Sequence, residues 1–220
     1  MGITKGNRQA GDPHKELGPP MDLPDSHFLK EGEQTRITPA VREYADRFPG
    51  SGLDTIAAIV ADIGSFRRKK AKYKELETLY SSRTAEQILE ERKMYLSNPY
   101  ARGAEHQVQG CIDVNVALCA VLRAKGIPAK FVRGRAHSTT HFKVGDEWMV
   151  ADPLDARTYK MNVRNGTADP DNPHPGVYRM DAERKEFIGI LKKKGEYAEG
   201  LDAWDLGIRG LKDYWRYHKS

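Results

Sequence analysis

The most continuously apolar stretch of the sequence lies near its middle, from Cys111 to Leu122. Apolar residues fill nearly every side of a helix drawn over this segment, so the pattern predicts a buried helix rather than an amphipathic surface helix. Gly126 followed by Pro128 marks where that helix ends. Cys111 is therefore expected in the first turn of a buried helix.

Three short strands are predicted after this helix, at 129–133, 141–144 and 147–152, and Gly145-Asp146 joins the last two as a hairpin. A two-residue loop places His141 opposite a residue of the third strand. Since side chains alternate along a strand, His141 and Asp152 then share a face of the sheet.

The register makes this pairing specific. His141 should lie opposite Val150, with Asp152 as its diagonal neighbour at about 7–8 Å between backbones. A three-residue loop would reverse this parity unless a bulge restored it.

Helical spacing and capping residues predict helices before Cys111. Thr38 and Pro39 begin a first helix that should reach Phe48. Asp54 is expected to cap a second helix, and Thr84 begins a third, through a capping box, that should run from about residue 85 to 95. One apolar stripe of the second helix is interpreted as core; it consists of Ile56, Ile59, Val60, Ile63 and Phe66.

The remaining segments have less regular patterns. Residues 1–35 are rich in Gly, Pro, Asp and Lys, which indicates an irregular N-terminal arm or wrap, and residues 36–220 are predicted to form one domain with a core at 80–160. The segment 165–176 should be a long loop, and 210–218 a terminal helix. Periodicity leaves 187–191 open between strand and helix.

The predicted elements place a nucleophile, a base and an acid in chain order. A helix start favours a thiolate over a thiol, so Cys111 is the candidate nucleophile. His141 would take its proton, and Asp152 would orient the imidazole. His137 competes with His141 for the base role; His141 is preferred because it begins a strand and shares parity with the acid. Asp155 is the alternative acid but follows an Asp-Pro turn.

An acyl-transfer enzyme also needs donors for the oxyanion of its tetrahedral intermediate. The backbone N–H of Cys111 is one. The nearest side-chain amides, Gln109 and Gln107, are candidates for the second. Asp113 is interpreted as an anion near the positive end of the helix dipole.

The order of these residues resembles the core of the transglutaminase-like superfamily. The resemblance rests on Gly110-Cys111-x-Asp113, on the run from Leu122 to Gly134, on His141 and on Trp148-x-x-x-Asp152-Pro153. It implies a papain-like α+β fold, with a nucleophile helix packed against an antiparallel sheet and helices N-terminal to it. It also implies a Cys-His-Asp triad of Cys111, His141 and Asp152, and an upstream aromatic residue such as Tyr80 as an oxyanion donor.

Composition narrows the function further. The 36 basic and 31 acidic residues leave a net charge of +5, which does not by itself argue for nucleic acid, and the basic run at 67–74 is interpreted as the solvated end of a helix. No stretch is apolar enough to span a membrane. Cys119 lies about 12 Å from Cys111 on one helix, which excludes a disulfide and favours a reducing, cytoplasmic location.

These observations predict a cysteine enzyme that transfers or hydrolyses an acyl group of a protein or peptide, with an amine as an alternative acceptor. No cofactor is expected. The Cys, His and Asp spacing lacks the close ligand pairs of a zinc site, and no loop has calcium-site spacing. A peptidase or amidase, and a binding module that has lost catalysis, remain alternatives.

Overall fold

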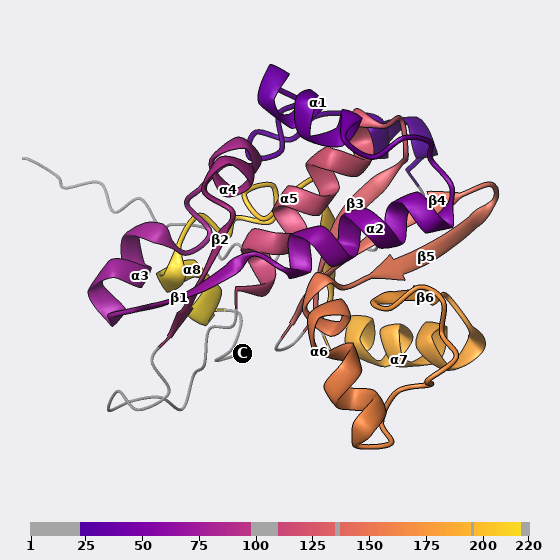
Figure 1. The fold of residues 1–220 in the computed structure, drawn as a ribbon. Helices are drawn as coiled ribbons and strands as arrows, with labels where there is room; N and C mark the ends of the chain where they lie inside the picture. The colour runs from indigo at the N-terminus through magenta and orange to yellow at the C-terminus, as the bar shows by residue number, and fades with distance from the viewer. Residues whose placement is uncertain (1–22, 98–109, 135–136, 195, 217–220) are drawn as a thin grey trace, which may run out of the picture.

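The computed structural model describes residues 23–97, 110–134, 137–194 and 196–216. Helices predominate before the central helix α5 (Cys111–Ala124), and the strands of the main sheet follow it (Figure 1). The helices are η1 (Asp25–Leu29), α1 (Pro39–Asp46), α2 (Leu53–Gly64), α3 (Tyr73–Leu79), α4 (Ala85–Glu91), α5 (Cys111–Ala124), α6 (Pro153–Arg164), α7 (Ala182–Lys193) and α8 (Leu211–Arg216). The strands are β1 (Arg67–Ala71), β2 (Lys93–Ser97), β3 (Ala129–Arg133), β4 (Ser138–Val144), β5 (Glu147–Ala151), β6 (Val177–Arg179) and β7 (Ala198–Gly200).

Helix α5 is the centre of the fold. All its residues from Cys111 to Arg123 are buried, because α1, α2, α4 and α6 pack around it while β3 and β4 cover its remaining side (Figure 1). Gly110 precedes the helix in the left-handed region at φ 79°, and Gly126 follows it at φ 74°. The predicted buried helix is confirmed, with Cys111 at its first position.

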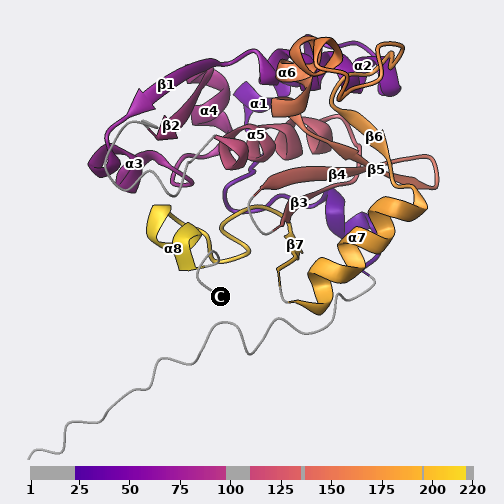
Figure 2. The same cartoon turned by 90° about the horizontal axis from the view of Figure 1, so that it is seen from below.

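The main sheet has five antiparallel strands in the order β6-β5-β4-β3-β7. Its central hairpin turns at Gly145-Asp146, and His141 pairs with Val150, as the two-residue loop predicts. Figure 2 shows α5 on one side of this sheet and α7 on the other. Alternate residues of β4 therefore face two different environments.

A second sheet consists of two parallel strands, β1 and β2. It shows that two predictions were wrong: the basic run at 67–74 as the end of a helix, and the third helix as far as about residue 95. The basic run beginning at Arg67 is a strand, not the end of a helix. Helix α4 stops at Glu91 because Arg92 adopts a left-handed conformation, and the Arg67 N–H donates to the Arg92 carbonyl. The strand depends on this distant partner, so the local charge pattern could not indicate it.

Capping predictions were confirmed at two of three helices. Thr38 and Thr84 accept the expected hydrogen bonds from the backbone N–H groups of Val41 and Gln87. The second helix begins one residue before Asp54, with Gly52 at the capping position. Its predicted apolar stripe is buried, as expected for core.

The end of the predicted N-terminal arm packs against the domain. Gln34 and Thr35 are fully buried. The guanidinium of Arg123 in α5 donates to the Phe28 carbonyl and to the Thr35 hydroxyl, at 3.1 and 2.8 Å. Residues 23–35 therefore wrap the C-terminal end of the central helix. Farther along the chain, 187–191 lies within the helix α7, and the loop after α6 begins at 165 as predicted.

Candidate functional site

Cys111 is held at a junction between helix α5 and strand β4. Its side chain is 2% exposed. The Asn115 amide donates to the carbonyls of Cys111 and of Ser138, both at 2.8 Å. One side chain thus ties the first turn of α5 to the start of β4, which brings the residues just before β4 next to the thiol.

His137 is the residue that occupies this position. Its Nε2 lies within hydrogen-bond distance of Asp152 Oδ2, and its imidazole is close enough to the Cys111 thiol for each group to shift the pKa of the other. The His137 carbonyl accepts from the Gly134 N–H and from the Arg133 guanidinium, both at 2.9 Å. Because Nε2 is taken by the carboxylate, Nδ1 is the ring nitrogen left for sulfur.

Asp152 is fixed by a second role, as the cap of helix α6. Its Oδ1 accepts from the Leu154 N–H at 2.9 Å, and its backbone N–H donates to the Gly176 carbonyl at 2.8 Å. One carboxylate oxygen therefore holds the helix while the other faces the imidazole. This division keeps the acid in place without any rearrangement.

The electrostatics favour a thiolate paired with an imidazolium. Burial alone would raise the pKa of Cys111, but the hydrogen bond and positive charge of His137, together with Arg133 and Tyr80, lower it below its ordinary value. Burial likewise opposes the charged form of His137, yet its hydrogen bonds to Asp152 and Cys111 raise the pKa of the imidazole. Each partner thus stabilises the charged form of the other.

His141 lies elsewhere, on the face of the sheet away from α5. The preceding Thr140 points at α5 and contacts Cys119 and Asn115, so alternation turns His141 toward Tyr197, whose ring centroid is 6.5 Å away. Within the described part of the chain, the expected hydrogen bond between His141 and Asp152 is not present. The structure brings together Cys111, His137 and Asp152 instead.

Parity could not distinguish the two histidines. In the observed register Thr139 would face Asp152, and His137 and His141 are two residues to either side of it. By count alone both positions have the same parity, but His137 precedes β4, so strand alternation does not fix the direction of its side chain. The deciding feature is the direction of α5, whose first turn lies at the start of β4. The Cys119 contact to Thr140 already places the second cysteine farther along that strand.

Tyr80 is the polar group above the thiol. Its hydroxyl lies 3.8 Å from Cys111 Sγ, and the residue is fully buried in the short segment after α3. Phenol and backbone N–H are both able to donate to an oxyanion. Gln107 and Gln109, the amides considered from the sequence, lie outside the described residues.

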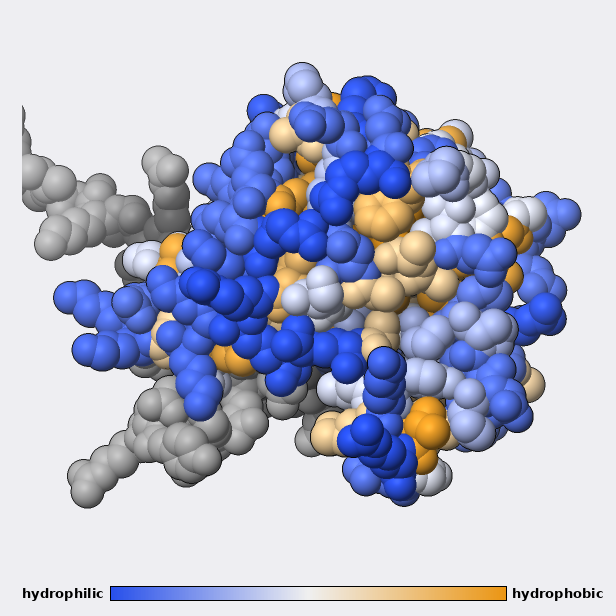
Figure 3. Space-filling model, in the orientation of Figure 1, coloured by the Kyte–Doolittle hydropathy of each residue, from blue (hydrophilic) through white to orange (hydrophobic). Residues whose placement is uncertain are grey.

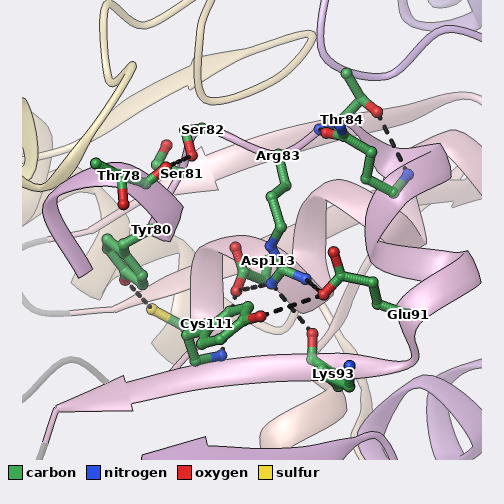
Figure 4. A network of polar contacts seen from close by, with 12 residues as sticks. Thr78, Tyr80, Ser81, Ser82, Arg83, Thr84, Glu91, Lys93, Cys111 and Asp113 are labelled. Carbon is green, nitrogen blue, oxygen red and sulfur yellow. Dashed lines mark hydrogen bonds and ion pairs between the residues drawn. The ribbon is translucent and has the colours of Figure 1, made fainter. Parts of the chain in front are cut away.

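Asp113 belongs to a buried ionic network behind the nucleophile (Figure 4). Arg83 pairs with its carboxylate and with Glu91, and also donates to the Lys93 carbonyl. The Tyr95 N–H donates to the same carboxylate at 3.4 Å. Burial raises the pKa of Asp113 and Arg83 opposes that rise. The cation compensates a negative charge that lies two residues from the thiol.

The other sequence candidates have structural partners of their own. Asp155 accepts from the Tyr178 hydroxyl at 3.2 Å. Burial raises the pKa of Cys119, whose sulfur lies 3.5 Å from the Thr140 hydroxyl. Across the described ranges, no three His, Cys, Asp or Glu side chains gather as metal ligands. No described helix has the length and apolar character needed to cross a bilayer.

Comparison with known proteins gives one family and one fold neighbour. A family model of the transglutaminase-like superfamily matches residues 42–153. A crystal structure of a protein from Cytophaga hutchinsonii, proposed to be a cysteine protease, is similar over 84% of this chain and 50% of its own, at 17% identity and a TM-score of 0.49. The chain thus spans half the length of that protein. No curated protein matches the sequence. The antiparallel sheet packed on a central helix agrees with the expected α+β fold, and the chain belongs to the transglutaminase-like superfamily.

Proposed function

We propose that this protein is a cysteine enzyme that cleaves or transfers the acyl group of an amide in a protein or peptide. One arrangement carries the proposal: His137 hydrogen-bonds to the Asp152 carboxylate and interacts with the Cys111 thiol closely enough to lower the pKa of the thiol. A buried thiol with a lowered pKa is unusual unless a cation faces it. The base is His137, in place of the His141 preferred from the sequence.

Acylation begins with attack of the Cys111 thiolate on the substrate carbonyl, forming a carbon–sulfur bond. The proposed donors to the oxyanion are the backbone N–H of Cys111 and the Tyr80 hydroxyl, which lies 3.8 Å from the Cys111 sulfur. The imidazolium of His137 then gives its proton to the leaving nitrogen, the carbon–nitrogen bond breaks, and ammonia or an amine departs from a thioester. Asp152 keeps the imidazole oriented throughout.

Deacylation reverses the proton's path. His137, now neutral, removes a proton from water or from an acceptor amine, which attacks the thioester carbonyl. The carbon–sulfur bond breaks, and the sulfur leaves as the thiolate beside the imidazolium. Water gives a carboxylic acid and an amine gives a new amide, so the same residues serve hydrolysis and transfer.

The test is to incubate the protein with a glutamine-containing peptide and to look, by intact mass, for a thioester between the peptide and Cys111. Wild-type protein should release ammonia and accumulate an adduct that Cys111→Ala lacks, because alanine has no nucleophile. If transfer is the main reaction, an added primary amine should attack the thioester in place of water, so that a new amide forms instead of the carboxylic acid. Turnover that survives Cys111→Ala would refute the mechanism.

The burial of Cys111 favours a second candidate, a binding module that retains the fold without turnover. At 2% exposure, the sulfur meets little solvent in this conformation. Alkylation by iodoacetamide separates the two. An enzyme should react quickly at neutral pH, whereas a closed module should leave Cys111 unmodified until the chain unfolds.

A further inference from the structure

The positive charge of the protein is concentrated in strand β1 and the residues after it. Residues 67–74 hold six Lys or Arg side chains and no acidic residue, more than the net charge of +5 of the whole chain. The first four, Arg67 to Lys70, are exposed. Figure 3 shows a strongly hydrophilic surface over β1 and α3. The positive charge is therefore concentrated on one part of the surface and is not spread evenly over the protein.

Two arginines near the start of this strand make no ion pair within the described residues. Arg157 of α6 donates through Nη1 to the carbonyls of Gly64 and Phe66, at 2.9 and 3.0 Å. Arg68 is two residues beyond Phe66. Burial lowers the pKa of Arg68 and the nearby positive charge of Arg157 lowers it further. Such a pair gains from an added anion.

The surface is adjacent to the candidate active site. Arg68 pairs with Met94 across the small sheet, and a side chain placed on Gly110 would meet Met94 at 2.9 Å. Gly110 precedes Cys111 directly. Strands are about 4.8 Å apart, so the Arg68 backbone lies on the order of 10 Å from that of Cys111. An extended chain covers this distance in about three residues.

We propose that β1 and Arg157 bind acidic side chains of an extended polypeptide substrate, about three residues from the amide that reaches Cys111. This inference rests on the proposed function, since it names the class of substrate for the same site. Carboxylates suit the surface because guanidinium groups bind them through paired hydrogen bonds. Nucleic acid fits less well: Tyr95, the aromatic residue of β2, is already covered by Lys69 and Arg83, so its ring is not free to stack on a base.

The test uses fluorescent peptides of about ten residues with one central glutamine. They carry Glu, Ser or Lys three positions to either side of that glutamine. Ammonia release by the wild type gives kcat/KM, and anisotropy with Cys111→Ala gives affinity without turnover. We expect the Glu peptides to exceed the Ser peptides by about tenfold in kcat/KM at low salt, with the preference shrinking as salt screens the charges.

The variant Arg68→Gln/Lys69→Gln removes two charges from the surface. Its matched control, Lys185→Gln/Lys193→Gln, removes two exposed charges from α7, beyond the main sheet. The β1 variant should lose most of the preference for Glu peptides while keeping the wild-type rate on Ser peptides. The control should keep both. Thermal unfolding of all three proteins verifies that each is folded.

The outcomes separate this inference from the proposed function. Turnover of Glu and Ser peptides at equal rates would overturn the acidic preference and leave the enzyme intact. The second outcome is that Glu peptides bind in a salt-sensitive way, that the β1 variant weakens this binding, and that neither turnover nor a thioester is detected. It would support the acidic-peptide surface and refute the proposed enzymatic activity. A single-stranded DNA of matched charge that binds more tightly than every peptide would overturn the polypeptide assignment.

Discussion

Two histidines four residues apart, one just before strand β4 and one within it, have opposite protonation chemistry. His137 meets a thiol and a carboxylate beside the first turn of α5, and its side chain is 44% exposed. His141 is 4% exposed on the α7 face, where burial first, and then Lys130, Lys192 and Arg184, lower its pKa to about 3. One favours the imidazolium and the other stays neutral.

The difference shows how much position matters beyond residue type. Both side chains share parity with Asp152, and both are near charged groups. His137 faces anions where α5 begins, so its proton is available for chemistry. His141 faces cations behind the sheet, where a proton would be repelled. The charges around each histidine, and therefore its protonation state, depend on whether the histidine lies at the first turn of α5.

The largest expected effect comes from replacing each histidine in turn, which tests whether only His137 acts as the base. His137→Ala should lower kcat/KM by about 10³-fold or more, because the base is lost. His141→Leu should stay within a few-fold of wild type. Iodoacetamide alkylation gives an independent measurement: the lowered pKa of Cys111 predicts fast reaction that falls only at acidic pH, and His137→Ala should shift that fall upward. A large loss in His141→Leu, with His137→Ala active, would reverse the assignment.

Replacing Asp152 tests whether its negative charge is needed beside His137. Asp152→Asn keeps an oxygen that can cap the Leu154 N–H but loses the negative charge beside His137. We expect kcat to fall by about 10²- to 10⁴-fold with little change in the free energy of unfolding. Asp155→Asn is the matched control, since its carboxylate accepts from Tyr178, and should remain within tenfold of wild type. Equal losses in both variants would contradict the distinct role of Asp152.

The smallest predicted effect is on stability and concerns the α7 face. The folded-state pKa of His141, about 3, lies below the unfolded value of about 6.5. The neutral form is favoured by folding, so this contribution is complete above pH 6.5 and is lost as pH falls toward 3. Wild type should lose about 2 kcal/mol of unfolding free energy from this residue between pH 7 and pH 5.

Urea unfolding at the two pH values measures that loss, and His141→Leu should remove it. The raised pKa of His137 has the opposite sign: its contribution is complete below about pH 6.5 and is lost only as pH rises through the raised value. It therefore changes little between pH 7 and pH 5. The same slope in wild type and in His141→Leu would contradict the neutral, buried state of His141.

The sequence by itself determined the elements whose cause is local. Continuous apolar character from Cys111 to Leu122 requires a buried helix, and Gly126 with Pro128 ends it. Thr38 and Thr84 start helices because their side chains satisfy N–H groups three residues on. The Gly145-Asp146 loop determines the hairpin register. Cys111 and Asp152 were candidates from the sequence because one begins the predicted buried helix and the other ends the third predicted strand; the helix α6 that Asp152 caps was not predicted.

Only the tertiary structure showed which histidine lies beside Cys111 and Asp152. Counting along a strand gives 137 and 141 the same parity, but in the folded chain His137 lies just before β4, next to the first turn of α5. The basic strand β1 likewise depends on β2, whose residues lie about twenty-five positions later in the chain. Contacts between distant segments leave no local pattern, because the free energy that selects them arises only when the packed partners exclude water from one another.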